Sequence, residues 1–559
     1  MTELLLGPLL RHVGEHEATI WVETDAPCVV QVRAGTHIGE DRTFRIASHD
    51  YAIVVLAGLE PGSSTAYEIL LDGRLAWPLP GSPFPASRIR TIDPGAPVRL
   101  LFGSCREPGR EGRHAAIDPD VLSAYALRMA SQAHEEWPDL IAMLGDQIYA
   151  DDTSDDMRRL IRKRRNPRRA PQYEVADFEE YTALYYEAWG KPEIRWLLAN
   201  LPSTMIFDDH DVRDDWNTSH AWRVDMEHTA WWRGRITGAL MSYWVYQHLG
   251  NLSPAGLAAD ATLAAVRAAS DGEAVLRAFA RAADREAEGA KGAMWSYRRD
   301  VGRVRLLVID SRCGRILVDG QRAMVGDAEF AWIEAQVEDG NFDHLVVGTS
   351  LPWLLPRALH DVESWDEALA GGSRGPLLAR LGEWLRRAVD LEHWAAFRES
   401  FDRLARLFAR IGRGEHGSRP PATICVISGD VHHSYVSEAA YPDSVTSRVY
   451  QITCSPMHNT IPRAMRVVFR LGWSTKTARV LHALGRYAGV APLELEWHHP
   501  TGPHFGNELA LLVFDGRAAR VVLERALPPA PGTPSEDLRT AQPGLAIVAD
   551  LALTDTPPG

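Results

Sequence analysis

The stretch LIAMLGDQIYADD, residues 140–152, gives the first indication of the fold. Its five apolar residues 140–144 are typical of a strand buried on both faces of a sheet. The run ends abruptly at Gly145, and polar residues follow, among them Asp146 and Tyr149. Because ligand sites in α/β sheets collect at the carboxyl ends of strands, we expect a functional site here.

The same pattern occurs at three other places, where an apolar run ends in side chains able to bind metal. These stretches are FGSC at the end of 98–102, FDDHDVRDDWN at the end of 203–207, and SGDVHHSY after 423–427. The polar side chains that they supply are Cys105, Asp208, Asp209, His210, Asp211, Asp430, His432 and His433. Four such strand ends predict one shared site.

These residue types can hold two metal ions side by side. A carboxylate at a strand tip can bridge two cations, and further carboxylates and imidazoles complete the two coordination spheres. Cys105 as thiolate and Tyr149 as phenolate suit a transition metal such as Fe³⁺, whereas the aspartates suit a harder ion such as Ca²⁺, Mg²⁺ or Mn²⁺. Two metals about 3.5–4 Å apart clamp a phosphoryl group and generate hydroxide at neutral pH.

The N-terminal residues 1–95 differ in pattern from the rest of the chain. Six short segments rich in β-branched and aromatic residues are separated by turn clusters, and no long helical period interrupts them. This predicts a β-sandwich of fibronectin or immunoglobulin type. The Pro-rich stretch 78–85 is expected to be a linker.

Residues 96–527 alternate buried-strand runs with long helical segments, which predicts an α/β core with a large central sheet and helical insertions. The insertions are expected at 226–249, 261–288 and 378–411. From residue 528 the Pro and Gly content predicts a C-terminal tail, 528–559, that is disordered or lies on the surface.

Composition excludes several classes of protein. The 559 residues are too many for one small domain. Sixty basic and 74 acidic residues give a net charge of −14, which argues against specific nucleic-acid binding. A hydrophobic content of 45% with 24% charged residues is ordinary for a globular chain and excludes wholesale disorder.

The sequence also bears on location. No apolar run reaches the ~18–20 residues that cross a bilayer. The N-terminus has an early Glu3 and lacks the basic n-region of a secretory signal. Five widely spaced cysteines, an odd number, do not indicate a disulfide framework. We therefore expect a cytoplasmic protein without a membrane span.

Taken in order, GSC, GDQIY, DDHD and GDVHHS resemble the motifs of the PhoD-like alkaline phosphatases, which belong to the calcineurin-like metallophosphoesterase superfamily. The resemblance covers roughly residues 95–525. It implies a sandwich of central sheets flanked by helices, and a β-sandwich ahead of the phosphatase domain is similar to the usual layout of the family. It also implies hydrolysis of phosphate monoesters or diesters, and it does not indicate which residues bind the substrate.

The resemblance further implies roles for seven residues. Cys105 corresponds to the iron ligand of the family, Asp146 to its bridging aspartate and Tyr149 to its tyrosinate ligand. His210 corresponds to the catalytic histidine. The remaining ligand positions fall on Asp209, Asp430 and His432. The implied cofactor is a binuclear centre of Fe³⁺ and a second divalent ion, which is Ca²⁺ or one of Mn²⁺, Mg²⁺ and Zn²⁺.

The sequence departs from the family at three points. Asp214 and Asp215 stand where some relatives have paired Asn, and GTS at 348–350 occupies the place of a separate metal-binding His. The twin-arginine signal of many relatives is not seen.

Two features leave alternatives open. The basic run RRLIRKRRNPRR, residues 158–169, is either a solvated loop or a positively charged rim beside the metal site that attracts polyanionic substrates. The fold itself is compatible with a phosphodiesterase or phospholipase D-type activity, or with a catalytically silent binding protein.

Overall fold

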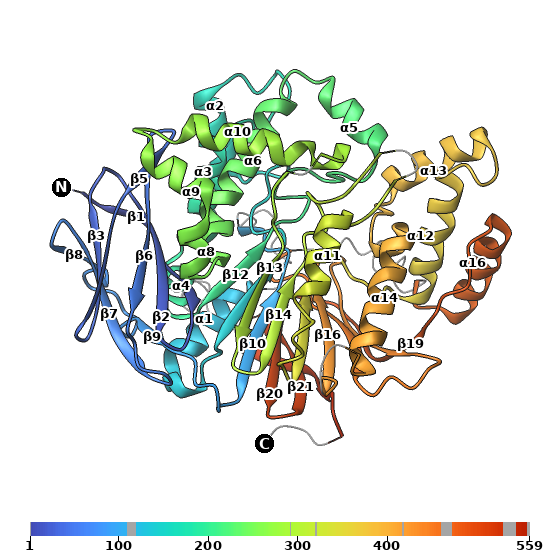
Figure 1. Cartoon of the computed structure of the whole chain (residues 1–559). Helices are drawn as coiled ribbons and strands as arrows, with labels where there is room; N and C mark the ends of the chain where they lie inside the picture. Colours follow the sequence, from blue (N-terminus) through green and yellow to red (C-terminus); the bar gives the residue numbers. More distant parts are fainter. Residues whose placement is uncertain are drawn as a thin grey trace.

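The computed structural model describes residues 2–108, 119–290, 292–318, 321–415, 419–459, 472–528 and 544–555. In Figure 1 an all-β layer lies at one side, two sheets lie in the middle, and helices lie above and beside the sheets. The mixed α/β sandwich that the sequence predicts is therefore confirmed. None of the described helices combines the length and apolar character that a membrane crossing requires.

Two sheets that share one apolar core form the N-terminal all-β part. One sheet has the order β1-β2-β6-β5 and the other β4-β3-β7-β8, with β9 beside β7. The strands are β1 (Leu4–Val13), β2 (Glu17–Thr24), β3 (Val29–Ala34), β4 (His37–Arg42), β5 (Phe44–Ile46), β6 (His49–Ala57), β7 (Ser64–Leu71), β8 (Arg74–Trp77) and β9 (Arg88–Arg90). Because strand side chains alternate between faces, Ile20 and Val22 fill the sandwich core, whereas Trp21 packs outward into the main core of the protein.

Buried polar groups join this sandwich to the rest of the molecule. Arg11 of β1 donates to the carbonyl oxygens of Tyr246 and Gln247, at 2.8 and 2.7 Å. Glu23 of β2 accepts from the hydroxyl of Tyr246 at 2.8 Å and contacts His49 at 2.9 Å. The Arg11 and Glu23 side chains are fully buried, so the β-sandwich is held in place by specific polar contacts as well as by apolar packing.

Two larger sheets form the centre of the molecule. The first has the order β12-β11-β10-β20-β21-β22 and the second β13-β14-β15-β16-β18-β17-β19. The strands of the first are β10 (Val98–Gly103), β11 (Leu140–Leu144), β12 (Ser203–Ile206), β20 (Glu508–Asp515), β21 (Ala518–Leu527) and β22 (Gly544–Ala552). The strands of the second are β13 (Tyr297–Val301), β14 (Val304–Val308), β15 (His344–Gly348), β16 (Thr423–Ser428), β17 (Ser434–Ala440), β18 (Arg448–Thr453) and β19 (Glu496–His504).

Parallel pairing brings the important strand ends together. β10, β11 and β12 are parallel neighbours in the first sheet. β14, β15, β16 and β18 are parallel neighbours in the second. β11 and β16 are buried at every position, as the continuous apolar runs predict for strands covered on both faces.

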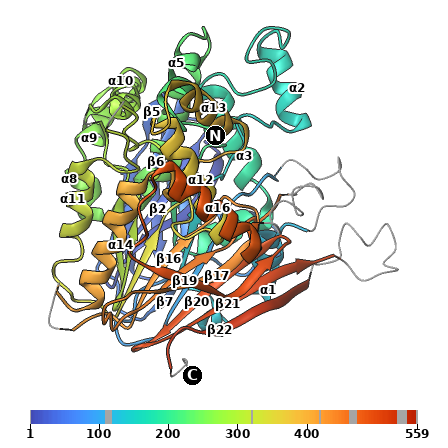
Figure 2. The same cartoon turned by 90° about the vertical axis from the view of Figure 1, so that its right-hand side faces the viewer.

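Helices cover the outer faces of the two sheets (Figure 1). The helices before the second sheet include α1 (Val121–Ser131), α2 (Asp155–Arg164), α3 (Phe178–Trp189), α4 (Pro192–Asn200), α5 (His220–Glu227) and α6 (Trp232–Ser242). Those that follow β14 include α11 (Asp327–Ala335), α12 (Arg357–Ala370), α13 (Pro376–Ala388), α14 (Arg398–Gly412) and α16 (Thr475–Ala488). Figure 2 shows α12, α13 and α16 side by side on one face of the molecule.

The single helix expected over 261–288 is wrong. The segment forms α9 (Ala261–Ala268), α10 (Glu273–Asp284) and the short η4 (Arg285–Glu288). The break falls at ASDG, where the Asp271 carboxylate accepts from the backbone N–H groups of Glu273 and Ala47. The turn-favouring residues Ser, Asp and Gly of this stretch therefore separate α9 from α10.

The C-terminal segment 528–559 also differs from the expected tail. Residues 529–543 and 556–559 lie outside the described residues, but β22 between them pairs antiparallel with β21 and extends the first sheet. The sequence GLAIVADLA supplies the β-branched and apolar residues that a strand needs. The Pro/Gly content that indicated a tail belongs to the flanks of this strand.

Candidate active site

Four loops meet at the carboxyl ends of strands from both central sheets. The loops after β10, β11 and β12 come from the first sheet, and the loop after β16 comes from the second. The backbone N–H of Cys105 donates to the Gly145 carbonyl at 3.3 Å, which joins the first two loops. The backbone N–H of Asp430 donates to the Ser104 hydroxyl at 3.2 Å, which joins the two sheets. The expectation of one shared location therefore agrees with the geometry.

Four of the seven candidate site residues have an unusual backbone conformation. Cys105, Asp146, Asp430 and His432 adopt φ values of 53°, 51°, 67° and 51°. This left-handed region is uncommon for residues other than Gly and costs conformational energy. The contacts between the loops hold these residues in it, and such strain is concentrated at functional sites.

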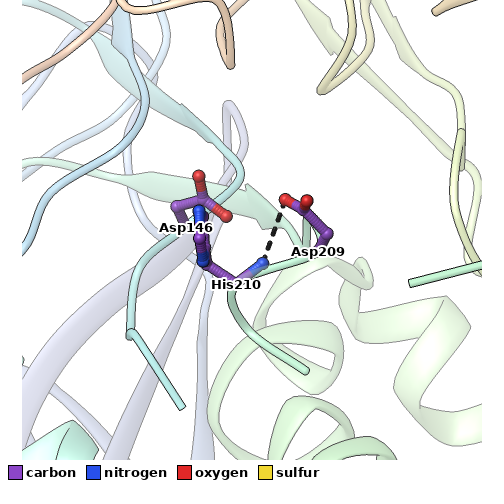
Figure 3. Close-up of side chains that lie close together, drawn as sticks. All are labelled: Asp146, Asp209 and His210. Atoms are coloured by element: carbon purple, nitrogen blue, oxygen red, sulfur yellow. Dashed lines mark hydrogen bonds between the residues drawn. The ribbon is translucent and has the colours of Figure 1, made fainter. Parts of the chain in front are cut away.

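Two compact groups of acidic and imidazole side chains lie at the loop ends. Asp146, Asp209 and His210 each place a potential ligand atom within 4.8 Å of the others, and Asp208, Asp209 and Asp430 do the same. Figure 3 shows the first group, with the His210 backbone N–H donating to Oδ1 of Asp209 at 3.0 Å. Asp209 is common to both groups, so the two groups form one continuous set of potential ligands.

The electrostatics of these groups fit a bound cation. Burial and the neighbouring acids raise the pKa values of Asp208 and Asp209 to about 7, although Arg312 opposes this shift. Burial also raises the pKa of Asp146 well above its ordinary value. Among the described residues, Oδ1 of Asp146 and Oδ2 of Asp208 are buried without a hydrogen-bond partner. Buried carboxylates of this kind are normally paired or coordinate metals, so the donor set fits metal ions.

Cys105 and Tyr149 lie at the edge of the acidic groups. The Cys105 thiol donates to the Asp430 carbonyl at 3.7 Å, and the Tyr149 hydroxyl accepts from the Asn459 amide at 2.9 Å. Burial, together with the Asp146 charge, raises the pKa of both side chains well above its ordinary value. Both groups would therefore be anionic only beside a strong positive charge such as Fe³⁺.

His210 combines a fixed orientation with partial exposure. Its Nδ1 lies 2.9 Å from Oδ2 of Asp151, and its ring stacks on the Tyr149 ring with centroids 4.7 Å apart. Its side chain is 25% exposed, whereas that of Asp151 is 9% exposed. Asp151 therefore fixes the orientation of the imidazole through Nδ1, and the His210 side chain lines a cavity together with Asp146 and Asp209.

That cavity has a volume of about 260 Å³. Candidate ligands and other charged groups line it together with apolar side chains. The first kind comprises Asp146, Asp209, His210, Asp214, Glu363, Asp390, Glu392, His393, Asp430 and His432. The second comprises Leu355, Leu359, Val389, Leu391 and Val431. The lining of the cavity therefore combines charged and apolar side chains.

Several residues around the site were not foreseen from the sequence. The fully buried Arg312 contacts four carboxylates, namely Asp208, Asp209, Glu392 and Asp430. His393 contacts Oδ2 of Asp430 at 2.9 Å and Oε1 of Glu363 at 2.6 Å. Arg312 ends the stretch IDSR, residues 309–312, which directly follows β14. His393 lies in a loop and gives no comparable signal.

The two departures Asp214 and Asp215 lie beside the acidic groups. The backbone N–H of Asp214 donates to Asp151 at 2.7 Å, and that of Asp215 donates to Asp209 at 3.3 Å. Burial and the Glu392 charge raise the pKa of Asp215 to about 9. Both residues thus support the loop that carries Asp209.

The basic run after Tyr149 does not form a rim on the cavity. Its N-terminal part is the end of α2, where acidic residues neutralise much of its charge. The ion pairs are Arg158–Asp152, Arg159–Asp156, Arg164–Asp177 and Arg165–Glu180. None of the run lines the cavity as far as the described residues define it. The solvated interpretation of this run is the better one.

The sandwich of two sheets and its acidic loops define a metal-dependent phosphoesterase. The sequence profile of the PhoD-like phosphatases matches residues 121–476, and that of a domain of unknown function (DUF7800) matches residues 1–89. The chain therefore belongs to the PhoD-like phosphatase family and is a hydrolase of phosphoric ester bonds. The family resemblance seen in the four motifs is confirmed.

A solved structure supports the fold. A structure described as PhoD matches with a TM-score of 0.58 and 13% identity, over 98% of this chain and 89% of that one. A weaker match, with a TM-score of 0.47 and 12% identity, is purple acid phosphatase PPD1 from seeds of yellow lupin (Lupinus luteus), over 92% of this chain and 71% of that one. No curated protein sequence matches the chain.

Proposed function

We propose that the protein hydrolyses phosphate monoesters, diesters or both at a binuclear metal centre. The observation that carries this proposal is the position of Asp209, which belongs to two overlapping groups of potential ligands. The two ions of a binuclear phosphoesterase lie about 3.5–4 Å apart. Two overlapping groups of potential ligands, with Asp146 in one of them, could hold such a pair. The intact loops at all four strand ends argue against the alternative of a silent binding protein.

The proposed ligands are Cys105, Asp146, Tyr149, Asp209, Asp430 and His432. Cys105 and Tyr149 are the donors suited to Fe³⁺, and the carboxylates suit a second divalent ion such as Ca²⁺, Mn²⁺, Mg²⁺ or Zn²⁺. When bound, the metals would supply charge neutralisation on phosphorus and a nucleophile at neutral pH.

Side chains of the protein would assist the leaving group, orient the catalytic imidazole and exclude water. His210 would donate a proton or a hydrogen bond to the leaving oxygen, since its ring lines the cavity beside Asp146 and Asp209. Asp151 would hold the imidazole in the required orientation through its contact with Nδ1. The apolar side chains of the cavity lining would exclude water from the parts of the substrate that they contact.

The apolar side chains in the cavity lining favour a diester as one substrate class. A phosphate monoester has one organic substituent, whereas a diester has a second that must find a place in the cavity. Leu355, Leu359 and Leu391 line a surface on which an apolar second substituent would pack. Comparison of a nitrophenyl monoester with a nitrophenyl alkyl diester would measure this preference.

We also propose a cytoplasmic location. All five cysteines are free and buried, which is compatible with a reducing compartment. Fractionation of cells that express the tagged full chain would test this part of the proposal.

Metal removal tests the central proposal. Exhaustive chelation should abolish hydrolysis of a chromogenic phosphoester, and added metal should restore it. Asp209→Asn should lower the content of both metals, whereas Asp225→Asn, on the surface helix α5, should leave metal and activity unchanged. Tyr149→Phe should shift or remove a visible phenolate-to-iron band. Metal-free protein with full activity would overturn the proposal.

A further inference from the structure

The helices α13 and α16 expose an unusual amount of apolar surface. Eight of the sixteen exposed large apolar side chains of the described residues lie on these helices or at their ends. Five belong to α13 and the residue that follows it, and three belong to α16. They are Leu377, Leu378, Leu381, Trp384, Val389, Val480, Leu484 and Tyr487.

On both helices the exposed apolar residues follow the same spacing. Leu377, Leu381 and Trp384 stand at positions i, i+4 and i+7 of α13, and are 79%, 49% and 65% exposed. Val480, Leu484 and Tyr487 repeat this spacing on α16. Residues at these intervals lie on one face of a helix, so each helix presents an apolar stripe to solvent.

The two stripes come together at one end. α13 and α16 both pack against α12, and both lie at the outer edge of the molecule in Figure 1. The guanidinium of Arg374, just before α13, stacks on the Tyr487 ring near the end of α16, 4.5 Å from its centroid. The start of one stripe therefore meets the end of the other. We call this surface the α13/α16 face.

Basic residues outnumber acidic ones among the exposed residues of the α13/α16 face, where Asp390 at the end of α13 is the exposed acid among the described residues. The chain carries a net charge of −14. The exposed basic residues of the face are Arg374, Arg380, Lys476, Arg479 and Arg486. Helix α16 contains no acidic residue. A positively charged face on an acidic protein is complementary to an anionic surface.

We propose that the α13/α16 face docks the protein on an anionic lipid bilayer. Trp, Tyr and Leu flanked by Arg and Lys are the composition of helices that lie in the plane of a membrane interface. A second copy of this chain fits less well, because a symmetric contact would bring the same basic residues together. Docking would also place the catalytic cavity near the headgroups, since Val389 at the end of α13 lines that cavity.

Vesicle binding by the full-length protein tests this proposal. The wild-type protein should float with vesicles that contain phosphatidylglycerol, and it should bind pure phosphatidylcholine vesicles more weakly. Leu381→Ser combined with Trp384→Ser should weaken binding to the anionic vesicles by more than about tenfold, because it removes the apolar stripe of α13. The matched control is Ile38→Ser combined with Leu75→Ser, two residues of similar exposure on the N-terminal sandwich, and it should bind as wild type.

The basic residues give an independent arm of the test. Lys476→Gln combined with Arg479→Gln should weaken binding by roughly 25-fold, because each basic residue near an anionic surface contributes about fivefold. Added salt should weaken wild-type binding more than it weakens binding of this variant.

Two results would overturn the proposal. One is wild-type protein that binds neither kind of vesicle. The other is a wild-type dimer, seen by light scattering, that dissociates in the Leu381→Ser, Trp384→Ser variant, because a second copy would then cover the face. Hydrolysis of a soluble chromogenic phosphoester should be unchanged in all these variants. A failure of docking is thereby separated from a failure of the proposed enzymatic activity.

Discussion

Arg312 donates a hydrogen bond from Nε to Oδ1 of Asp208, and both side chains are buried. The same guanidinium lies 3.4 Å from Asp209 and 3.7 Å from Asp430, and it also pairs with Glu392. One cation of the chain therefore binds carboxylates from both central sheets. Its role is to position acids that would otherwise repel one another.

Arg312→Gln should lower the free energy of unfolding of the metal-free protein by about 3–5 kcal/mol, because it leaves buried carboxylates without their partner. Arg312→Lys should recover only part of this loss, since an ammonium group lacks the fork geometry. Urea unfolding measures both. Arg303→Gln is the control: this exposed arginine pairs with Asp343 at the surface, and its loss should cost about 1 kcal/mol or less. Equal losses for Arg312→Gln and Arg303→Gln would contradict the positioning role.

His210→Ala should lower kcat by about 10²–10⁴ while metal content and thermal stability stay near wild type. The loss should be smaller for nitrophenyl phosphate, whose leaving group needs little protonation, than for an alkyl phosphate. Asp151→Asn should give a smaller loss, because the imidazole stays in the cavity but its orientation is less well fixed. If the two substrates suffer equally, His210 is not the proton donor.

Gly429→Ala tests the contact between the two sheets. A Cβ at this position would lie 1.7 Å from the Ser104 hydroxyl, so the loops after β10 and β16 would be forced apart. We expect loss of activity and a lower melting temperature. The double variant Gly429→Ala, Ser104→Gly should recover part of the activity and of the melting temperature, because it removes the side chain that the new Cβ would clash with. The control Gly95→Ala, where the nearest atom is 3.5 Å away, should be neutral. A fully active single variant would show that the contact is not needed.

His49 should make stability depend on pH. Burial alone would lower its pKa, but the hydrogen bonds to Glu179 and Glu23 outweigh burial and raise the pKa to about 9 from its ordinary value of 6.5. Because the folded pKa is the higher one, the stabilisation is complete below pH 6.5 and is lost as the pH rises to about 9.

His49→Gln should therefore remove stability on the order of 2 kcal/mol at pH 6, and the difference from wild type should vanish above the folded pKa. Chemical denaturation at a series of pH values measures this. The exposed histidine His220 on α5 is the control, and His220→Gln should follow the wild-type profile. A difference that does not change with pH would refute the explanation.

The loops that carry the candidate ligands could be located from the sequence because each follows an uninterrupted apolar run. Cys105, Asp146, Asp209 and Asp430 stand next to such runs, and the ends of parallel strands meet at one edge of a sheet. The supporting residues could not be found in this way. His393 reaches Asp430 from a loop that follows α13, and no local pattern marks a residue that becomes important only through tertiary contact.

In the fold, too, features with a local sequence pattern could be predicted, whereas features that depend on tertiary contacts could not. Strand runs and the change of pattern near residue 95 indicated the architecture, because burial on both faces leaves a clear signature. The helical segment expected over 261–288 is interrupted because turn-favouring residues at 269–272 outweigh the helix propensity of the Ala-rich sequence around them. Strand β22 was missed because its neighbours are rich in Pro and Gly. Its pairing with β21 depends on a surface that the local sequence does not reveal.

The pairing of β10 with β20 has a consequence for synthesis of the protein on the ribosome. β10 precedes the first ligand loop, yet one of its two neighbours is formed by Glu508–Asp515, about four hundred residues later. The loop with Asp430 must also join Ser104 across a similarly long span. Contacts so distant along the chain form late. A nascent chain would therefore stay without metal and without activity until almost all of it has left the exit tunnel.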